Sequence, residues 1–80
     1  MLTEKRMSDL LPGECAVVTE LSAPDAFRRR LQDLGLIRGT RIRCLMKSPM
    51  GDPHAYLIRG AVIALRQRDC ETVTVQIPCP

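Results

Sequence analysis

Aromatic and imidazole side chains are scarce in this sequence. Its 80 residues include no tryptophan, one tyrosine (Tyr56), one phenylalanine (Phe27) and one histidine (His54). Barrels that bind single-stranded nucleic acid present several exposed aromatic platforms, and readers of proline-rich peptides need an aromatic-lined groove. Two aromatic residues supply neither surface. The composition therefore leaves a module that works through surface shape, aliphatic contact and arginine.

Motifs for catalysis or phosphate binding are also missing. The sequence has no G-x-x-x-x-G-K-[ST] and no G-x-G-x-x-G pattern, so it offers no glycine-rich phosphate cradle. His54 follows Gly51-Asp52-Pro53 in a predicted exposed loop, and no partner is apparent that would make it a base. We therefore predict that the chain is not an enzyme and has neither catalytic residues nor a cofactor site.

No metal-ligand cluster can be recognised. The four cysteines lack the close C-x-x-C pairs typical of zinc sites. Asp52 with His54, and the run 69–71 (Asp-Cys-Glu), offer too few ligands to hold an ion firmly. We predict no metal site, and only weak binding of a transition metal stays open.

The surroundings of three cysteines in the sequence predict whether their side chains are buried or exposed. Cys15 and Cys44 lie within apolar runs and are predicted to be small buried side chains. Cys79 stands between two prolines and is predicted to be exposed. Since no secretion signal is apparent, we expect no disulfide framework.

Long apolar runs are absent as well. Charged residues within positions 4–9 exclude the apolar core of a secretion signal there. No uncharged stretch reaches the ~18 residues that cross a bilayer. We expect a soluble cytoplasmic domain, which only a membrane partner would recruit to the inner face of the cell membrane.

Hydrophobic periodicity predicts one clear helix, over residues 25–34. Phe27, Leu31 and Leu34 recur at i, i+4 and i+7 and should face the core. Gly35 follows the helix at the position where a left-handed residue commonly ends it.

The remaining segments predict a mainly β fold. Five β-rich segments alternate with turn residues, at 15–21, 40–47, 54–59, 61–66 and 72–77. A single helical turn is expected at 8–11 and a short helix at 67–71, while residues 1–7 are expected to be flexible. This order suggests one domain over residues 1–80 with its core at 8–77. We predict a small, closed antiparallel barrel with a helix inserted after the first strand.

Four motifs, in this order, resemble the ferrous iron transport protein A family (FeoA). They are Arg-Leu-x-x-Leu-Gly-Leu at 30–36, Gly39-Thr40, Met-Gly-Asp-Pro at 50–53 and Ala-Leu-Arg at 64–66. The resemblance implies an SH3-like barrel and an accessory or regulatory role in bacterial ferrous iron uptake. It also implies that the partner is the cytoplasmic GTP-binding domain of the membrane permease FeoB. Whether such a protein affects nucleotide turnover, assembly or gating is not implied.

The residues themselves suggest a docking surface for such a partner. Arginines beside exposed aliphatic side chains are a common anchor arrangement at protein interfaces. The outward helix face and two apolar turns provide this combination. The proposed contact residues are Arg28, Arg29, Gln32, Leu36, Ile37, Arg38, Met50, Gly51, Asp52 and Pro53. The alternative is that Leu36 only closes the helix end and Met50 only covers the barrel.

Two other functions remain as alternatives. The barrel type also resembles the C-terminal, metal-binding domain of iron-dependent repressors, although this sequence has no helix-turn-helix segment. A basic barrel could instead bind nucleic acid through the strand arginines, which are Arg41, Arg43, Arg59, Arg66 and Arg68. The net charge of +3 and pI of about 8.9 are low for that role, so we expect no nucleic-acid partner.

Overall fold

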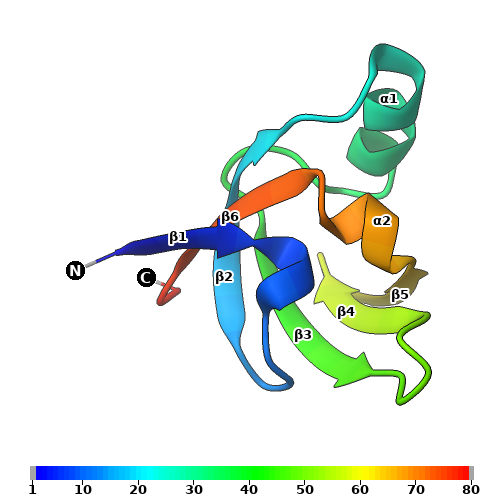
Figure 1. Ribbon diagram of the computed structural model, residues 1–80. Helices are drawn as coiled ribbons and strands as arrows, with labels where there is room; N and C mark the ends of the chain where they lie inside the picture. The colour runs from blue at the N-terminus through cyan, green and yellow to red at the C-terminus, as the bar shows by residue number, and fades with distance from the viewer. Residues whose placement is uncertain (1, 80) are drawn as a thin grey trace.

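Six antiparallel strands form one strongly curled sheet in the computed structural model, which describes residues 2–79 (Figure 1). The strands are β1 Thr3–Arg6, β2 Cys15–Leu21, β3 Arg41–Lys47, β4 His54–Ile58, β5 Ala61–Leu65 and β6 Val73–Ile77. The helices are the 3-10 turn η1 Met7–Asp9, α1 Asp25–Asp33 and α2 Gln67–Cys70. The predicted mainly β fold, with α1 inserted before β3, is confirmed.

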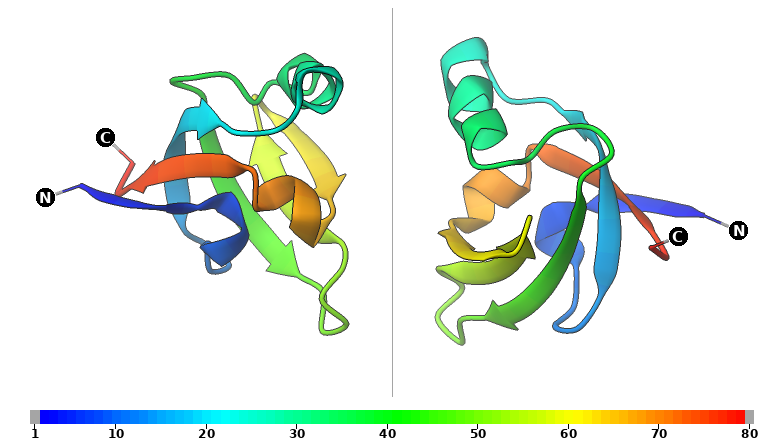
Figure 2. Two further views of the ribbon diagram at one scale, coloured as in Figure 1. Left: turned by 45° about the horizontal axis from the view of Figure 1, so that its top comes forward. Right: turned by 180° about the vertical axis from the view of Figure 1, so that it is seen from behind.

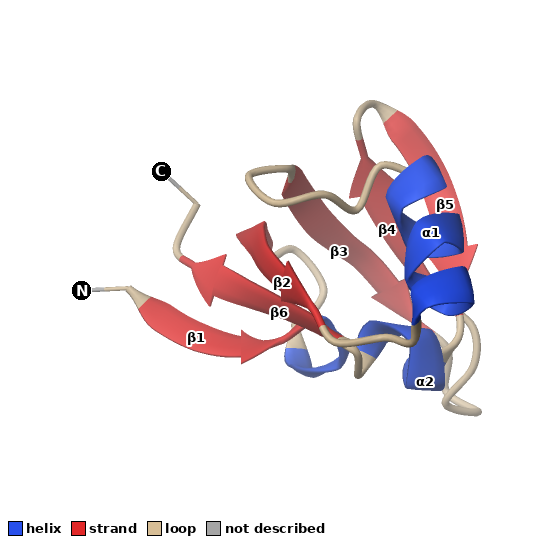
Figure 3. Cartoon of the chain, turned by 90° about the horizontal axis from the view of Figure 1, so that it is seen from above, coloured by secondary structure: helices blue, strands red, loops and turns tan. Residues whose placement is uncertain are grey.

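The sheet has the order β1-β6-β2-β3-β4-β5. Among residues 2–79, β1 and β5 each pair with one neighbour only, so hydrogen bonds do not close the expected barrel. Instead η1 packs against α2 near this gap, and the Tyr56 hydroxyl donates to the Met7 carbonyl oxygen at 3.3 Å. Figures 2 and 3 show α1 above the β4–β5 side of the sheet.

The prediction of a flexible segment at 1–7 is wrong for residues 3–6. These residues form β1, a strand in addition to the five predicted ones. It pairs with β6, from Thr3 opposite Ile77 to Arg6 opposite Thr74. The segment Thr-Glu-Lys-Arg has no hydrophobic alternation that would reveal a strand. Charged side chains are nevertheless typical of edge strands, because they discourage pairing with other chains.

Helix α1 ends at the predicted glycine, but its buried stripe differs from the expectation. Gly35 adopts φ = 107°, its N–H donates to the Gln32 carbonyl, and the Leu36 N–H donates to the Leu31 carbonyl at 3.1 Å. This Schellman pattern brings an apolar residue back over the last turn. Leu36 therefore joins Leu31 in the core with no exposed surface, whereas Leu34 is exposed.

The cysteine predictions are only partly right. Cys44 is a buried free thiol as expected, but Cys15 and Cys79 form a disulfide. The pairing of Val17 with Gln76 runs antiparallel, so the start of β2 lies beside the residues that follow β6. Two cysteines separated by 64 positions meet only through this register, which their spacing does not reveal.

His54 is not an exposed loop residue. It begins β4 between Lys47 of β3 and Leu65 of β5, and it is only 4% exposed. Neither ring nitrogen has a hydrogen-bond partner among the described residues. The preceding turn residues Asp52 and Pro53 are exposed. His54 is buried because it is the first residue of β4 and no longer part of the turn.

In the first half of β3, inward and outward side chains alternate as in a regular strand. Ile42 and Cys44 face the core, while Arg41 and Arg43 face outward. A register shift between Cys44 and Met46 then turns the Met46 side chain outward. A β-bulge of this kind adds one residue to a strand, and every later side chain changes face.

Candidate docking surfaces

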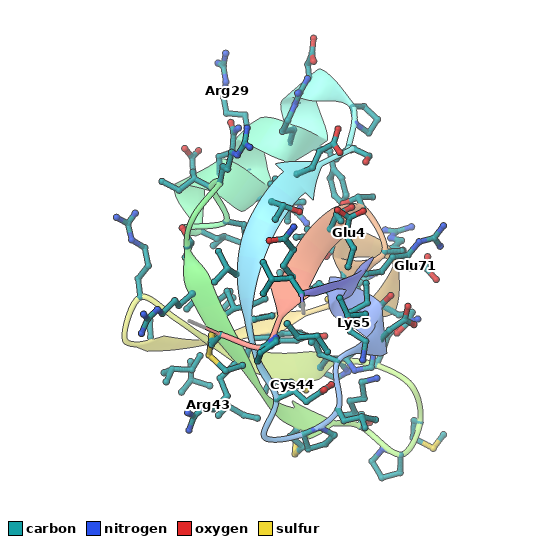
Figure 4. All side chains as sticks on the ribbon, turned by 90° about the vertical axis from the view of Figure 1, so that its left-hand side faces the viewer. Glu4, Lys5, Arg29, Arg43, Cys44 and Glu71 are labelled. Carbon is teal, nitrogen blue, oxygen red and sulfur yellow. A yellow bond between two sulfur atoms is a disulfide. The ribbon has the colours of Figure 1, made fainter. Side chains whose placement is uncertain are left out.

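Five of the predicted contact residues gather at one end of the fold. Arg28, Arg29 and Gln32 lie on α1, while Ile37 and Arg38 lie in the loop that leads to β3. We call these five residues the helix-end surface. Arg28 is half-buried and donates to Asp25 at 2.6 Å, and the other four are exposed. Figure 4 shows Arg29 pointing away from the body of the protein.

The predicted role of Leu36 in this surface is contradicted. Its side chain has no exposed area, because the closing turn after α1 folds it into the core against Leu31. A residue buried in this way stabilises the helix end and offers nothing to a partner. The alternative reading of Leu36 as a closing contact is therefore confirmed.

The second predicted part, residues 50–53, lies elsewhere. The helix-end loop precedes β3 and this turn follows it, so seven strand residues separate the two parts. A rise of ~3.3 Å per residue places them about 20 Å apart, at the top and bottom of Figure 1. Met50 is 90% exposed, whereas Asp52 accepts a hydrogen bond from the Gln67 N–H at 2.6 Å. The two parts therefore do not form one continuous patch, and Asp52 has a structural contact within the chain.

A further exposed surface was missed from the sequence. We call it the sheet face, and it consists of Arg43, Leu45, Met46, Leu57 and Val62 on the outer side of strands β3, β4 and β5. The register places Arg43, Leu57 and Val62 in one cross-strand row. The residue spacing within one strand does not reveal this surface, because only the register shows that residues of three strands are neighbours.

A polar groove opens on the same outer side of the sheet, over strands away from the sheet face. It has a volume of about 640 Å³ and runs along β1, β6 and β2 toward the loop at Arg38. Its side-chain lining comes mainly from Glu4, Val17, Thr19, Glu20, Arg38 and Gln76. Two carboxylates and one guanidinium line it, and the Thr19 hydroxyl is already used in a bond to the Thr74 carbonyl.

The buried free thiols of Cys44 and Cys70 are not activated as nucleophiles or metal ligands. Burial raises the pKa of Cys70 to about 11, and burial also raises the pKa of Cys44. Both thiols therefore stay protonated at neutral pH, and a protonated thiol is a poor nucleophile and metal ligand. Within residues 2–79, no group of three or more His, Cys, Asp or Glu side chains is placed to hold a metal ion.

Within residues 2–79, no helix combines the length and the apolar character needed to cross a bilayer.

Similar proteins identify the family. Residues 5–77 match the FeoA domain family. The solution structure of FeoA from Chlorobium tepidum is 39% identical, covers 94% of this chain and 71% of its own, and superposes with a TM-score of 0.86. The zinc-complexed FeoA of Stenotrophomonas maltophilia, a prokaryotic SH3 domain protein, is 31% identical with a TM-score of 0.79 over 91% of this chain and 95% of its own.

A longer relative carries the same domain. The Fe(2+) transport protein A/Fe(2+) transporter FeoB fusion protein of Porphyromonas gingivalis is 29% identical over 72 residues. These residues are 90% of this chain, which spans only 8% of the length of that relative. The predicted SH3-like fold is confirmed by the solved structures. The chain belongs to the FeoA domain family.

Proposed function

We propose that this chain is an accessory protein of ferrous iron uptake that binds the cytoplasmic GTP-binding part of the permease FeoB. The fusion protein of Porphyromonas gingivalis carries the proposal, because it joins a domain similar to this chain and the transporter in one polypeptide. Two functions held together by a covalent link in one organism are candidates for non-covalent association in another. The chain would thereby be held at the inner face of the membrane.

The proposed action is protein contact without catalysis. The helix-end surface supports this, because Arg29, Ile37 and Arg38 are all exposed there. Arginine is enriched among the few residues that supply most of the binding energy at protein interfaces. The guanidinium of Arg28 already forms a salt bridge with Asp25. Arg29 and Arg38 are therefore the arginines of this surface that we expect to contact the partner.

A binding titration tests the proposal. The purified chain is titrated against the cytoplasmic domain of the permease with a GTP analogue, with GDP and without nucleotide. We expect saturable binding in at least one state, and the same protein with Arg29→Glu should bind at least about 10-fold more weakly, a loss of ~1.4 kcal/mol.

A matched variant controls for net charge. Arg6→Glu makes the same charge change on β1, outside the helix-end surface, and should leave the affinity within about twofold. Absence of binding in all three nucleotide states contradicts the proposed function. Equal weakening by both variants would mean that general charge, and not this surface, drives association.

A further inference from the structure

The sheet face is an apolar surface without a partner inside the chain. Met46 on β3 is 54% exposed and Val62 on β5 is 68% exposed; the exposed Leu57 lies on β4 between these strands, and the exposed Leu45 precedes Met46 on β3. The next cross-strand row contains Met46, Ala55 and Ala64, so no charged residue interrupts the apolar area there. Contiguous exposed aliphatic residues of this kind commonly mark interaction sites.

The charged residues on the strands of this face have one sign. Strands β3, β4 and β5 contain no aspartate or glutamate. Arginines lie on the face and at its ends, namely Arg41, Arg43, Arg59 and Arg66. None of the four forms a salt bridge with any residue between 2 and 79. In Figure 4, Arg43 points outward on the side opposite to Glu4 and Glu71.

We propose that the sheet face is a second docking surface, and that it binds a protein surface with an apolar centre and carboxylates at its rim. Unpaired guanidiniums around aliphatic side chains match this arrangement in both charge and polarity, because arginine pairs with carboxylates in two-point contacts. The inference rests on the proposed function, since the cytoplasmic domain of the permease is the expected partner.

Other occupants fit less well. A second copy of this chain, packed face to face, would bring two sets of arginines together, and like charges at an interface cost several kcal/mol. Single-stranded nucleic acid would need aromatic side chains for stacking, but Phe27 and Tyr56 both lie off this face, and Tyr56 is fully buried.

An arginine at the end of the sheet face, Arg59, lies against the end of α1. A β-carbon placed on Gly35 would lie 2.9 Å from the Cδ of Arg59, so the Arg59 side chain rests against the end of α1. Arg59 also belongs to the turn between β4 and β5. One large partner could therefore contact both surfaces at this corner of the fold.

The test compares three variants of the full chain in the same titration with the permease's cytoplasmic domain. Arg43→Glu reverses a charge on the sheet face, Val62→Asp places a carboxylate in its apolar area, and Arg6→Glu is the matched control. We expect the first two to weaken binding at least about 10-fold and the control to stay within twofold. Thermal melts followed by circular dichroism verify that each variant is folded. Because Arg43 is exposed, we expect Arg43→Glu to leave the core unchanged.

The outcomes separate this inference from the proposed function. If the wild type binds and both sheet-face variants bind within twofold of it, the inference is overturned while the proposed function stands. If the wild type does not bind, both are overturned. Two further results would overturn the inference about the sheet face. A wild-type dimer in sedimentation that Arg43→Glu dissociates would show that the face binds a second copy of the chain. Retention of the wild type on DNA that Arg43→Glu abolishes would show that the face binds nucleic acid.

Discussion

The disulfide between Cys15 and Cys79 gives a sharp prediction about stability. The cross-link joins the start of β2 to the segment after β6, and it closes a loop of 64 positions, most of the chain. Replacing Cys79 by serine opens this loop and leaves the six strands and their register unchanged. The effect of Cys79→Ser should therefore come mainly from the unfolded state, which gains conformational freedom.

The size of the effect follows from the loop length. With a sequence separation of 64, the chain-entropy relation gives a stabilisation of about 4 kcal/mol at 25 °C. A domain of this size commonly has a free energy of unfolding of only ~5–10 kcal/mol. The variant should therefore remain folded at neutral pH but unfold at a much lower urea concentration.

Urea titrations with and without a phosphine reductant measure the difference. The free energy of unfolding of the oxidised wild type should exceed that of Cys79→Ser by about 4 kcal/mol. The reductant should lower the free energy of unfolding of the wild type to that of the variant. The variant itself is the control for the reductant, because it has no disulfide to lose. A difference below about 1 kcal/mol would refute the loop-entropy argument, and four titratable thiols in the denatured wild type would refute the disulfide itself.

Three further predictions concern single side chains. Gly35→Ala should lower the free energy of unfolding by about 2 kcal/mol or more, because φ is 107° and the new β-carbon would lie 3.1 Å from Cγ2 of the buried Ile58; Gly39→Ala, at φ = 92° with open space, should lower it by only about 1 kcal/mol, and equal thermal shifts would contradict the role of the Ile58 contact. His54→Leu should raise the free energy of unfolding by about 1 kcal/mol, because it removes two buried nitrogens without hydrogen-bond partners; a loss of stability in urea would contradict this. Burial raises the pKa of Cys70 from 9.0 to about 11, so its contribution to stability is complete below pH 9 and is lost between pH 9 and 11, where only the unfolded thiol ionises. Urea titrations at pH 8 and 10.5 should therefore show a smaller alkaline loss for Cys70→Ala than for the wild type, and equal losses would exclude this thiol as a cause.

The elements that could be predicted are those with a local signal. The stripe of Phe27 and Leu31 in α1, and the glycine that ends the helix, depend on residues within one or two turns of each other. The strand at 41–47 was likewise recognisable from the alternation of Ile42 and Cys44 with arginine. The N-terminal strand was not, because β1 is a polar edge strand that is held in place by its pairing with β6.

The docking surfaces depended on information that is not local. Leu36 was expected to be accessible because it follows a turn, but the backbone bond from its N–H to Leu31 brings it into the core. The turn at Met50 was grouped with the helix because arginines beside an exposed aliphatic residue suggest an anchor for a partner, and only the length of β3 shows that the turn and the helix lie at opposite ends. The sheet face depends on the register of three strands, which the sequence does not state.

The pairing of Thr3 with Ile77 has a consequence for engineering the chain. Figures 1 and 2 show the N and C labels on the same side of the molecule, far from α1. A short glycine-rich tether could join these positions and allow new termini to be cut into the exposed turn 49–51. Such a circular permutant would keep every strand neighbour while offering attachment points at the opposite pole.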